Sequence, residues 1–302
     1  MPDSPASPTP YEVLGVAANA SQAELRRAYR RLLREAHPDT GGDPARFHAV
    51  QDAWQRIGEA GARARWDRGG SAEGPAASGS AEPRAATRRA GSSPRARAYG
   101  HPGGHARERF LVLMREWAGR GVNLDDPYDP ALVRSAPREL RHLLADALAE
   151  EATARAVSGL GIGYTIWSDV ATERGKIDHV VLGPAGLFAI MSEDWGSPVR
   201  LVRGELEGEG VTAGETPVRD LARRARSLGR EVRVTFTASL IVVPDDDLAE
   251  PITSIGRKAE SAIVRLSVLP GALRDGLGGG QRLSIEDVFD VRTRLQNGIR
   301  FV

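Results

Sequence analysis

The residues best suited to recognising a partner lie near the beginning of the chain. His37, Pro38 and Asp39 follow a segment in which five arginines occur without an intervening acid: Arg26, Arg27, Arg30, Arg31 and Arg34. A patch of one charge sign suits an acidic partner surface. Proline disfavours helical backbone in the residue before it, so His37 and Asp39 are expected on a loop beside the arginines. The pattern predicts a docking surface for an acidic partner.

Two helices are expected to position this loop. Ser21 is a natural N-cap, and Glu24 completes an S-x-x-E capping box. The helix that follows carries apolar residues at spacings of three and four, at Leu25, Ala28, Tyr29, Leu32 and Ala36. Pro44 opens a second helix, whose apolar face comprises Phe47, Val50, Trp54 and Ile57. The two helices predict an antiparallel hairpin with the loop at its tip.

Residues 9–68 resemble the J domain of the DnaJ family. The resemblance is carried by YEVLGV at 11–16, AYRRL at 28–32, HPD at 37–39, Phe47, Ala53-Trp54, and RARWD at 63–67, where tryptophan stands in place of the family's tyrosine. It implies a helical module that stimulates ATP hydrolysis by a DnaK-type chaperone through the HPD loop and the basic helix. The chain itself has no phosphate loop, so the resemblance assigns nucleotide hydrolysis to the partner.

The composition limits what else the chain can be. Of its 302 residues 41% are hydrophobic and 27% charged, the net charge is +1, and cysteine is absent. The hydrophobic and charged fractions are ordinary for a globular protein. The absence of cysteine excludes disulfides, thiolate zinc sites and a cysteine nucleophile. The N-terminus lacks the basic start and apolar run of a secretory signal, and the longest apolar stretch, 238–243, is far too short for a membrane helix. We therefore expect a cytoplasmic protein with no membrane partner.

The chain is expected to be multidomain, with two domains joined by a linker. Residues 9–68 form the all-α hairpin, whereas residues 69–106 lack the large apolar side chains that a core requires. We predict a flexible Gly/Ser/Pro/Arg linker there. Residues 107–302 predict an α/β domain with a helical extension at its start. Its helices are expected at 139–160, 218–228 and 285–295, and its strands at 164–170, 177–181, 187–191, 199–202, 235–243 and 262–266.

Several motifs of the second domain resemble the nuclease-related domain, a branch of the restriction-endonuclease-like fold. They are GKIDHVV at 175–181, Gly183-Pro184, GLFAI at 186–190, Trp195-Gly196 and LSIEDV at 283–288. The resemblance covers residues 145–298. It implies a site built from an acid on a helix, an aspartate on a strand and an E-x-K motif on the next strand, in which the carboxylates hold a divalent metal.

Mapped onto this chain, the family's site is incomplete. The resemblance places the helix acid at Glu151, with neighbouring Glu150 as the alternative, and the aspartate at Asp178. The E-x-K motif falls on Met191-Ser192-Glu193, with methionine in place of the metal-binding glutamate and glutamate in place of the lysine. We therefore expect a catalytically inactive site. No cofactor is expected beyond weak binding of Mg²⁺ or Mn²⁺ by Glu151, Asp178 and Glu193.

Three functions are consistent with the sequence. The leading hypothesis is a J-domain co-chaperone whose inactive nuclease-like domain selects a client protein or a location. The first alternative is an active metal-dependent DNase, in which Lys176, two residues before Asp178 and on the same side of the expected strand, replaces the missing lysine. The second is an adaptor that binds nucleic acid through linker arginines and those of a later helix: Arg223, Arg224, Arg226 and Arg230.

Overall fold

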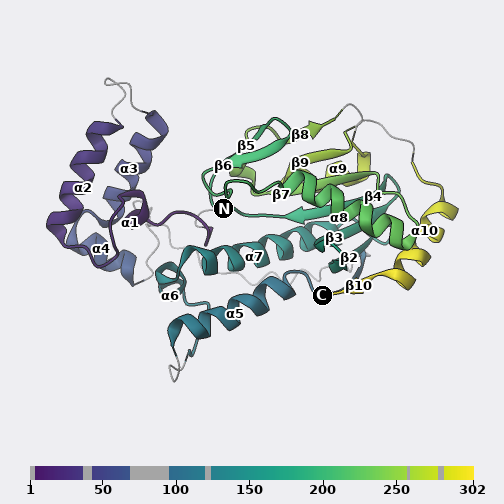
Figure 1. Ribbon diagram of the computed structural model, residues 1–302, viewed down its shortest axis with the longest axis horizontal. Helices are drawn as coiled ribbons and strands as arrows, with labels where there is room; N and C mark the ends of the chain where they lie inside the picture. The colour runs from purple at the N-terminus through teal and green to yellow at the C-terminus, as the bar shows by residue number, and fades with distance from the viewer. Residues whose placement is uncertain (1–3, 37–42, 69–94, 120–123, 257–258, 278–281) are drawn as a thin grey trace, which may run out of the picture. The chain divides into compact units, whose positions relative to one another are not determined.

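The computed structural model describes residues 4–36, 43–68, 95–119, 124–256, 259–277 and 282–302. The chain divides into two compact units (Figure 1), which we call the first unit, residues 7–89 with 123–137, and the second unit, residues 1–6 and 90–122 with 138–302. The loop at 37–39 and residues 69–94 of the expected linker lie outside the described residues. In the described part of the chain, no helix has the length and apolar character to cross a membrane.

The first unit consists of short helices around one small core. They are α1 (Pro10–Val13), α2 (Gln22–Glu35), α3 (Pro44–Ile57), α4 (Ala60–Asp67) and α6 (Pro130–Ser135). Ser21 and Glu24 form the expected capping box at the start of α2. Leu25 and Leu32 of α2 pack with Val50 of α3 in the core. The predicted helical hairpin is confirmed.

Arg63 of α4 connects α4 to α1 and to the turn before α2 through hydrogen bonds. Its guanidinium donates hydrogen bonds to the Tyr11 hydroxyl at 2.9 Å and to the carbonyl oxygens of Ala18 and Ala20, each at 2.7 Å. The Tyr11 hydroxyl in turn donates to Asp67 Oδ1 at 2.8 Å. Burial and the Asp67 hydrogen bond raise the pKa of Tyr11 to about 12, so the hydroxyl remains a donor at neutral pH. The closing RARWD motif therefore joins α4 to α1.

Trp66, the tryptophan of that motif, lies between two cations. The guanidinium carbon of Arg56 lies 5.6 Å from the ring centroid and that of Arg134 lies 5.0 Å from it. Arg134 belongs to α6, so residues 124–137 pack within the first unit, although they were expected in the second domain. The sequence could not show this contact because it joins residues that are distant along the chain.

The second unit is centred on a mixed sheet in the order β1-β2-β3-β4-β7-β9-β8, with β10 also paired to β2. The strands are β1 (Arg97–Tyr99), β2 (Thr165–Thr172), β3 (Gly175–Gly183), β4 (Gly186–Ser192), β7 (Ala238–Val243), β8 (Ile252–Ile255), β9 (Ser261–Arg265) and β10 (Arg300–Phe301). β5 (Val199–Val202) and β6 (Glu205–Gly208) form a separate hairpin. β2, β3 and β4 run antiparallel, whereas β4, β7 and β9 run parallel.

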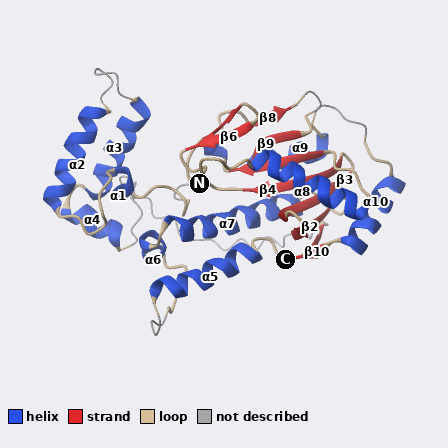
Figure 2. Cartoon of the chain, viewed as in Figure 1, coloured by secondary structure: helices blue, strands red, loops and turns tan. Residues whose placement is uncertain are grey.

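Helices cover both faces of this sheet (Figure 2). α7 (Arg138–Ser158) and α9 (Leu269–Asp275) lie on one face, and α8 (Pro217–Val232) and α10 (Ile285–Gly298) lie on the other. α5 (Gly104–Ala118) lies along α7. Alternate residues of β4 face opposite layers, as a buried strand requires: Phe188 and Ile190 pack toward α7, and Leu187 and Ala189 pack toward α8. The predicted α/β architecture is confirmed.

The boundary expected at residue 107 lies too late in the chain. Residues 97–99 form β1, which pairs in parallel with β2, and α5 begins at Gly104. Tyr99 stacks on Trp167 with 5.9 Å between ring centroids. A strand of three residues has too little periodicity to be recognised in a polar stretch, and the same holds for the short strands β6, β8 and β10.

Candidate functional site

The arginines of α2 form the first candidate surface. Arg26, Arg27, Arg30, Arg31 and Arg34 are all exposed, on the side of α2 opposite Leu25, Ala28 and Leu32. Glu35 approaches this face, 3.8 Å from Arg31, but both side chains are more than half exposed, so the pair is weak. The face therefore keeps the positive charge predicted for it. His37, Pro38 and Asp39 at its end lie outside the described residues.

The second candidate site is a cluster of carboxylates around one ammonium group. Lys176 Nζ lies 2.6 Å from Glu150 Oε1, 2.8 Å from Asp169 Oδ1 and 3.2 Å from Asp178 Oδ1. The three acidic side chains are between 3% and 9% exposed, and Lys176 is 18% exposed. We call these four residues the Lys176 cluster. It was only partly predicted, because Asp169 carried no motif that could identify it.

The backbone of β2 explains how Asp169 reaches the cluster. Asp169 has a φ of +56°, and it separates the pairs formed by Ser168 with His179 and by Val170 with Ile177. Left-handed backbone is uncommon outside glycine, although aspartate adopts it more readily than most residues. The irregularity lies opposite Asp178 on β3, so two neighbouring strands present carboxylates at the same point.

Backbone N–H groups bind the carboxylate oxygens that Lys176 does not. Gly103 donates to Glu150 Oε2 at 3.1 Å, and His105 donates to Asp169 Oδ2 at 3.2 Å. Ser192 donates to Asp178 Oδ2 at 2.8 Å. All six oxygens of the three carboxylates therefore have a hydrogen-bond or ion-pair partner within the protein.

Two of these donors, Gly103 and His105, lie at the N-terminus of α5, which no sequence motif connects with the site. Gly103 has a φ of +71°, and a Cβ atom on it would lie 2.6 Å from the carbonyl oxygen of Ala147 in α7. Only glycine permits this approach without displacement of the backbone. The glycine pair at 103–104 thus lets the first turn of α5 reach the carboxylates.

The charges of the cluster shift the pKa values of its members. Burial, followed by the charge of Asp178, raises the pKa of Glu150 to about 8 even though Lys176 opposes the shift. Burial alone would lower the pKa of Lys176, but the charges of Asp178 and Glu150 and the hydrogen bonds to Asp169 and Glu150 raise it well above its ordinary value. Lys176 therefore stays charged.

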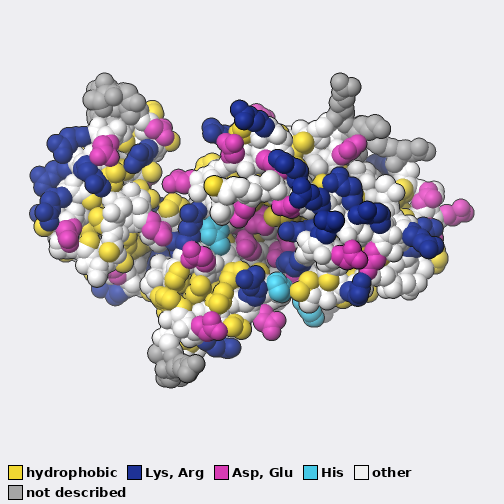
Figure 3. Space-filling model, viewed as in Figure 1, with side chains coloured by type: hydrophobic (Ala, Val, Ile, Leu, Met, Phe, Trp, Pro, Cys, Tyr) yellow, Lys and Arg dark blue, Asp and Glu magenta, His cyan; other side chains and the backbone are white. Residues whose placement is uncertain are grey.

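A second pair of carboxyl groups lies beside the cluster, in a pocket of about 620 Å³. Asp146 of α7 and Glu193 hydrogen bond to each other there, and Met191 lines the same pocket. Burial raises the pKa of Asp146 to about 7, and burial and the charge of Asp146 raise that of Glu193 well above its ordinary value. Acidic side chains gather between α7 and α8 on the face shown in Figure 3.

The structure corrects the residue expected on the helix. Glu151 does not join the Lys176 cluster; it forms an ion pair with Arg107 and approaches Arg155 at 3.8 Å, and its side chain is 27% exposed. Glu150, the neighbouring alternative, holds the position instead. Consecutive residues of an α-helix point about 100° apart, so an offset of one residue moves the carboxylate off the sheet.

The residues of the cluster do not fit a divalent metal. Mg²⁺ and Mn²⁺ need several free oxygen ligands, and here each carboxylate oxygen already has a partner within the protein. At the position expected for the metal-binding glutamate, Met191 supplies no oxygen and packs against the core on the α8 side of the sheet. In the described ranges, no group of three or more His, Asp or Glu side chains is arranged to hold a metal ion.

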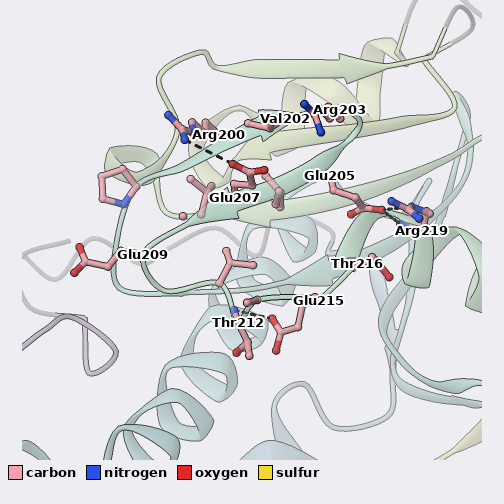
Figure 4. Close-up of a pocket in the computed structure, with 17 residues that line it drawn as sticks. Arg200, Val202, Arg203, Glu205, Glu207, Glu209, Thr212, Glu215, Thr216 and Arg219 are labelled. Carbon is pink, nitrogen blue, oxygen red and sulfur yellow. Dashed lines mark hydrogen bonds and ion pairs between the residues drawn. The ribbon is translucent and has the colours of Figure 1, made fainter.

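A larger pocket, of about 800 Å³, lies at the β5–β6 hairpin (Figure 4). Two of its arginines form ion pairs within the lining, Arg200 with Glu207 and Arg219 with Glu205. Glu205 accepts hydrogen bonds from the backbone N–H groups of Val218 and Arg219 and from Arg219 Nε. The carboxylate thus caps the first turn of α8, where an anionic ligand would otherwise be favoured.

Comparisons with known proteins agree with this division into two parts. The family model described as DnaJ domain matches residues 9–67, and the one described as Nuclease-related domain matches residues 145–244. Chaperone protein DnaJ of Levilactobacillus brevis is 46% identical over 67 residues, which are 21% of this chain and 18% of that protein. Chaperone protein DnaJ of Tropheryma whipplei is 52% identical over 59 residues, which are 19% of this chain and 17% of that protein.

The chain therefore spans less than a fifth of the length of these curated relatives. The nuclease-related match begins within α7 and ends just after β7, so it contains Glu150, Lys176 and Asp178. The chain thus joins a J domain, residues 9–67, to a nuclease-related domain, residues 145–244.

Proposed function

We propose that this protein is a J-domain co-chaperone that stimulates ATP hydrolysis by a DnaK-type chaperone, and that its nuclease-related domain binds a client or a nucleic acid without cutting it. The observation that supports the first part is the exposed arginine face of α2, which leads directly to the HPD sequence at 37–39. Two capped helices packed through one core hold this face rigid. A rigid surface of one charge sign favours fast association with an acidic partner.

The direct test is the steady-state ATPase rate of a DnaK-type protein with increasing amounts of the full chain. We expect the wild type to raise this rate, and the variant Arg27→Ala/Arg30→Ala/Arg31→Ala to need a roughly tenfold higher concentration for half of the increase. Alanine keeps the helix, so the change removes charge and not structure. The gap between variant and wild type should narrow at high salt, because screening weakens the interaction that the arginines provide.

A matched control removes the same number of charges elsewhere. Arg65, Arg68 and Arg109 are exposed arginines that lie outside α2. Their triple alanine variant should stimulate the ATPase as the wild type does. Equal losses in the two triple variants would contradict a specific role for the α2 face.

The proposal that the nuclease-related domain does not cut rests on two features of the chain. Met191 and Glu193 stand where the E-x-K motif of the resemblance requires a glutamate and a lysine. The remaining carboxylates are bound by Lys176 and by backbone N–H groups. A domain with this arrangement retains the fold and its surface, which are sufficient for binding.

A nucleic acid is the second candidate ligand because of a stripe of arginines on α8. Arg219, Arg223, Arg226 and Arg230 are exposed and follow each other at spacings of four and three, and Arg233, also exposed, is the residue just after the helix. Such spacing places the first four on one side of the helix along about 17 Å. Arg219 pairs with Glu205 and Arg223 with Asp220, whereas Arg226, Arg230 and Arg233 form no ion pair within the described residues. Figure 3 shows this basic surface over α8.

The stripe predicts salt-dependent binding to phosphate backbones without cleavage. We expect the full chain in EDTA to bind labelled duplex or single-stranded DNA, measured by fluorescence anisotropy. The variant Arg226→Gln/Arg230→Gln/Arg233→Gln should reduce the slope of log K against log salt by about 2–3, because each arginine displaces about one counterion. The Arg65, Arg68 and Arg109 triple glutamine variant is the control with equal charge. Identical salt slopes in all three proteins would exclude α8 as the binding surface.

A further inference from the structure

We infer that Lys176 is a permanent internal cation of the nuclease-related domain, and that its ammonium group holds the carboxylates that a divalent metal would otherwise hold. The inference deepens the proposed function and rests on it, since it concerns the same site in a domain that does not cut. The metal site implied by the family needs free carboxylate oxygens, and the oxygens of this cluster already have partners within the protein.

Lys176 lies among three carboxylates. An ammonium group has three N–H donors and no acceptor. Lys176 Nζ hydrogen bonds to Glu150 Oε1 at 2.6 Å and to Asp169 Oδ1 at 2.8 Å, and it forms an ion pair with Asp178 Oδ1 at 3.2 Å, so one cation faces three carboxylates. These acids come from α7, β2 and β3, and the lysine therefore joins three elements of the fold at one point.

The carboxylate oxygens that do not face Lys176 accept hydrogen bonds from the backbone. The N–H groups of Gly103, His105 and Ser192 each bind the second oxygen of one carboxylate. A metal entering this cluster would have to displace both the ammonium group and these backbone donors. Because the donors belong to the first turn of α5 and to β4, displacement would also break contacts of secondary structure.

The charge balance shows why a cation is needed at this position. Three carboxylates that are at most 9% exposed would repel each other strongly if no positive charge lay among them. Lys176 is covalently part of β3, so the compensation does not depend on the concentration of any ion. The nuclease-related domain should accordingly fold equally well with and without divalent metals.

The ion pair between Arg107 and Glu151 offers a comparison within the same domain. There Glu151 pairs with Arg107, and both side chains are between 27% and 29% exposed. Loss of Arg107 would leave the Glu151 carboxylate beside Arg155, and one partly exposed carboxylate is a poor ligand for a divalent ion. Loss of Lys176 would leave three convergent carboxylates, which resemble an oxygen site for Mg²⁺ or Mn²⁺.

The test is thermal unfolding of the full chain in EDTA and in millimolar Mn²⁺, for the wild type, Lys176→Met and Arg107→Met. Methionine preserves the length of the lysine stem and removes its charge. We expect the same melting temperature in both buffers for the wild type and for Arg107→Met. Lys176→Met should melt lower in EDTA, and Mn²⁺ should raise its melting temperature by roughly 5 °C. Electron paramagnetic resonance should show one bound Mn²⁺ per chain in Lys176→Met only.

Three outcomes would overturn the inference. The first is an equal Mn²⁺ shift in wild type and Lys176→Met, and the second is no shift in Lys176→Met. If Lys176→Met folds in neither buffer, the test is repeated with Lys176→Met/Glu150→Gln, which has one carboxylate fewer. The third outcome is that Mn²⁺ does not raise the melting temperature of this double variant. If the proposed co-chaperone function is wrong, the chain will not change the ATPase rate of the DnaK-type protein. The melting temperatures of the wild type, Lys176→Met and Arg107→Met should still be those expected.

Discussion

Replacing His37 by glutamine, or Asp39 by asparagine, should abolish the stimulation of a DnaK-type ATPase by this chain. Both residues follow the exposed arginines of α2, and the resemblance to the J domain gives the HPD sequence the contact that triggers hydrolysis in the partner. The substitutions remove a titratable ring or a charge while nearly preserving side-chain size. We therefore expect the ATPase rate to fall to that of the chaperone alone at every concentration of the variant.

The pattern of loss distinguishes these variants from the arginine variant. A higher concentration of the α2 arginine variant should restore the stimulation of the ATPase, because its docking is weaker but its HPD sequence is intact. Without His37 or Asp39, no concentration should recover it. Circular dichroism and the unfolding temperature should match those of the wild type. Full stimulation by His37→Gln would remove the mechanism on which the co-chaperone proposal depends.

Wild-type protein should not cleave plasmid DNA in Mg²⁺, whereas three substitutions together should produce cleavage. Met191→Glu and Glu193→Lys restore the E-x-K sequence, and Lys176→Gln releases Asp178 from its ammonium partner. A metal-bound carboxylate set and a positioned lysine each contribute roughly 10²–10⁴ in rate, so the gain over wild type should be measurable. The double variant that retains Lys176 should remain inactive, because the internal cation still occupies the cluster.

The control for this gain is the same triple variant with Asp178→Asn. Its amide oxygen can still accept the hydrogen bond from Ser192, but it cannot supply the negative charge that a metal needs. Cleavage should therefore disappear. The opposite result, cleavage by the wild type that is lost in Asp178→Ala, would make Lys176 the catalytic lysine and the protein an enzyme.

Much of the architecture could be predicted from the pattern of apolar residues. The capping box at Ser21 and the apolar stripe after it correctly predicted α2, and the buried runs from 164 to 191 correctly predicted β2, β3 and β4. These signals are local, so they persist in a single sequence. Asp178 could be placed on a strand for the same reason.

The composition of the acidic cluster depended on features that are not local. The choice between Glu150 and Glu151 depends on the rotation of α7 against the sheet, and alanines on several sides of this helix leave that rotation undefined by periodicity. Asp169 enters through a left-handed backbone conformation, and Gly103 and His105 contribute only backbone N–H groups. Backbone donors have no signature in the sequence, so no pattern could connect α5 with the carboxylates.

The donors supplied by the first turn of α5 have a practical consequence for recombinant work on the nuclease-related domain. A fragment cut at the limits of the family match, 145–244, would lose Gly103 and His105. One oxygen of Glu150 and one of Asp169 would then have no hydrogen-bond donor, and each unsatisfied oxygen would lower the stability of the domain by about 1–3 kcal/mol. The fragment would also lose β1, β9 and the first turns of α7. Expression should therefore start before Ala96 and continue through Val302; shorter fragments should accumulate as inclusion bodies.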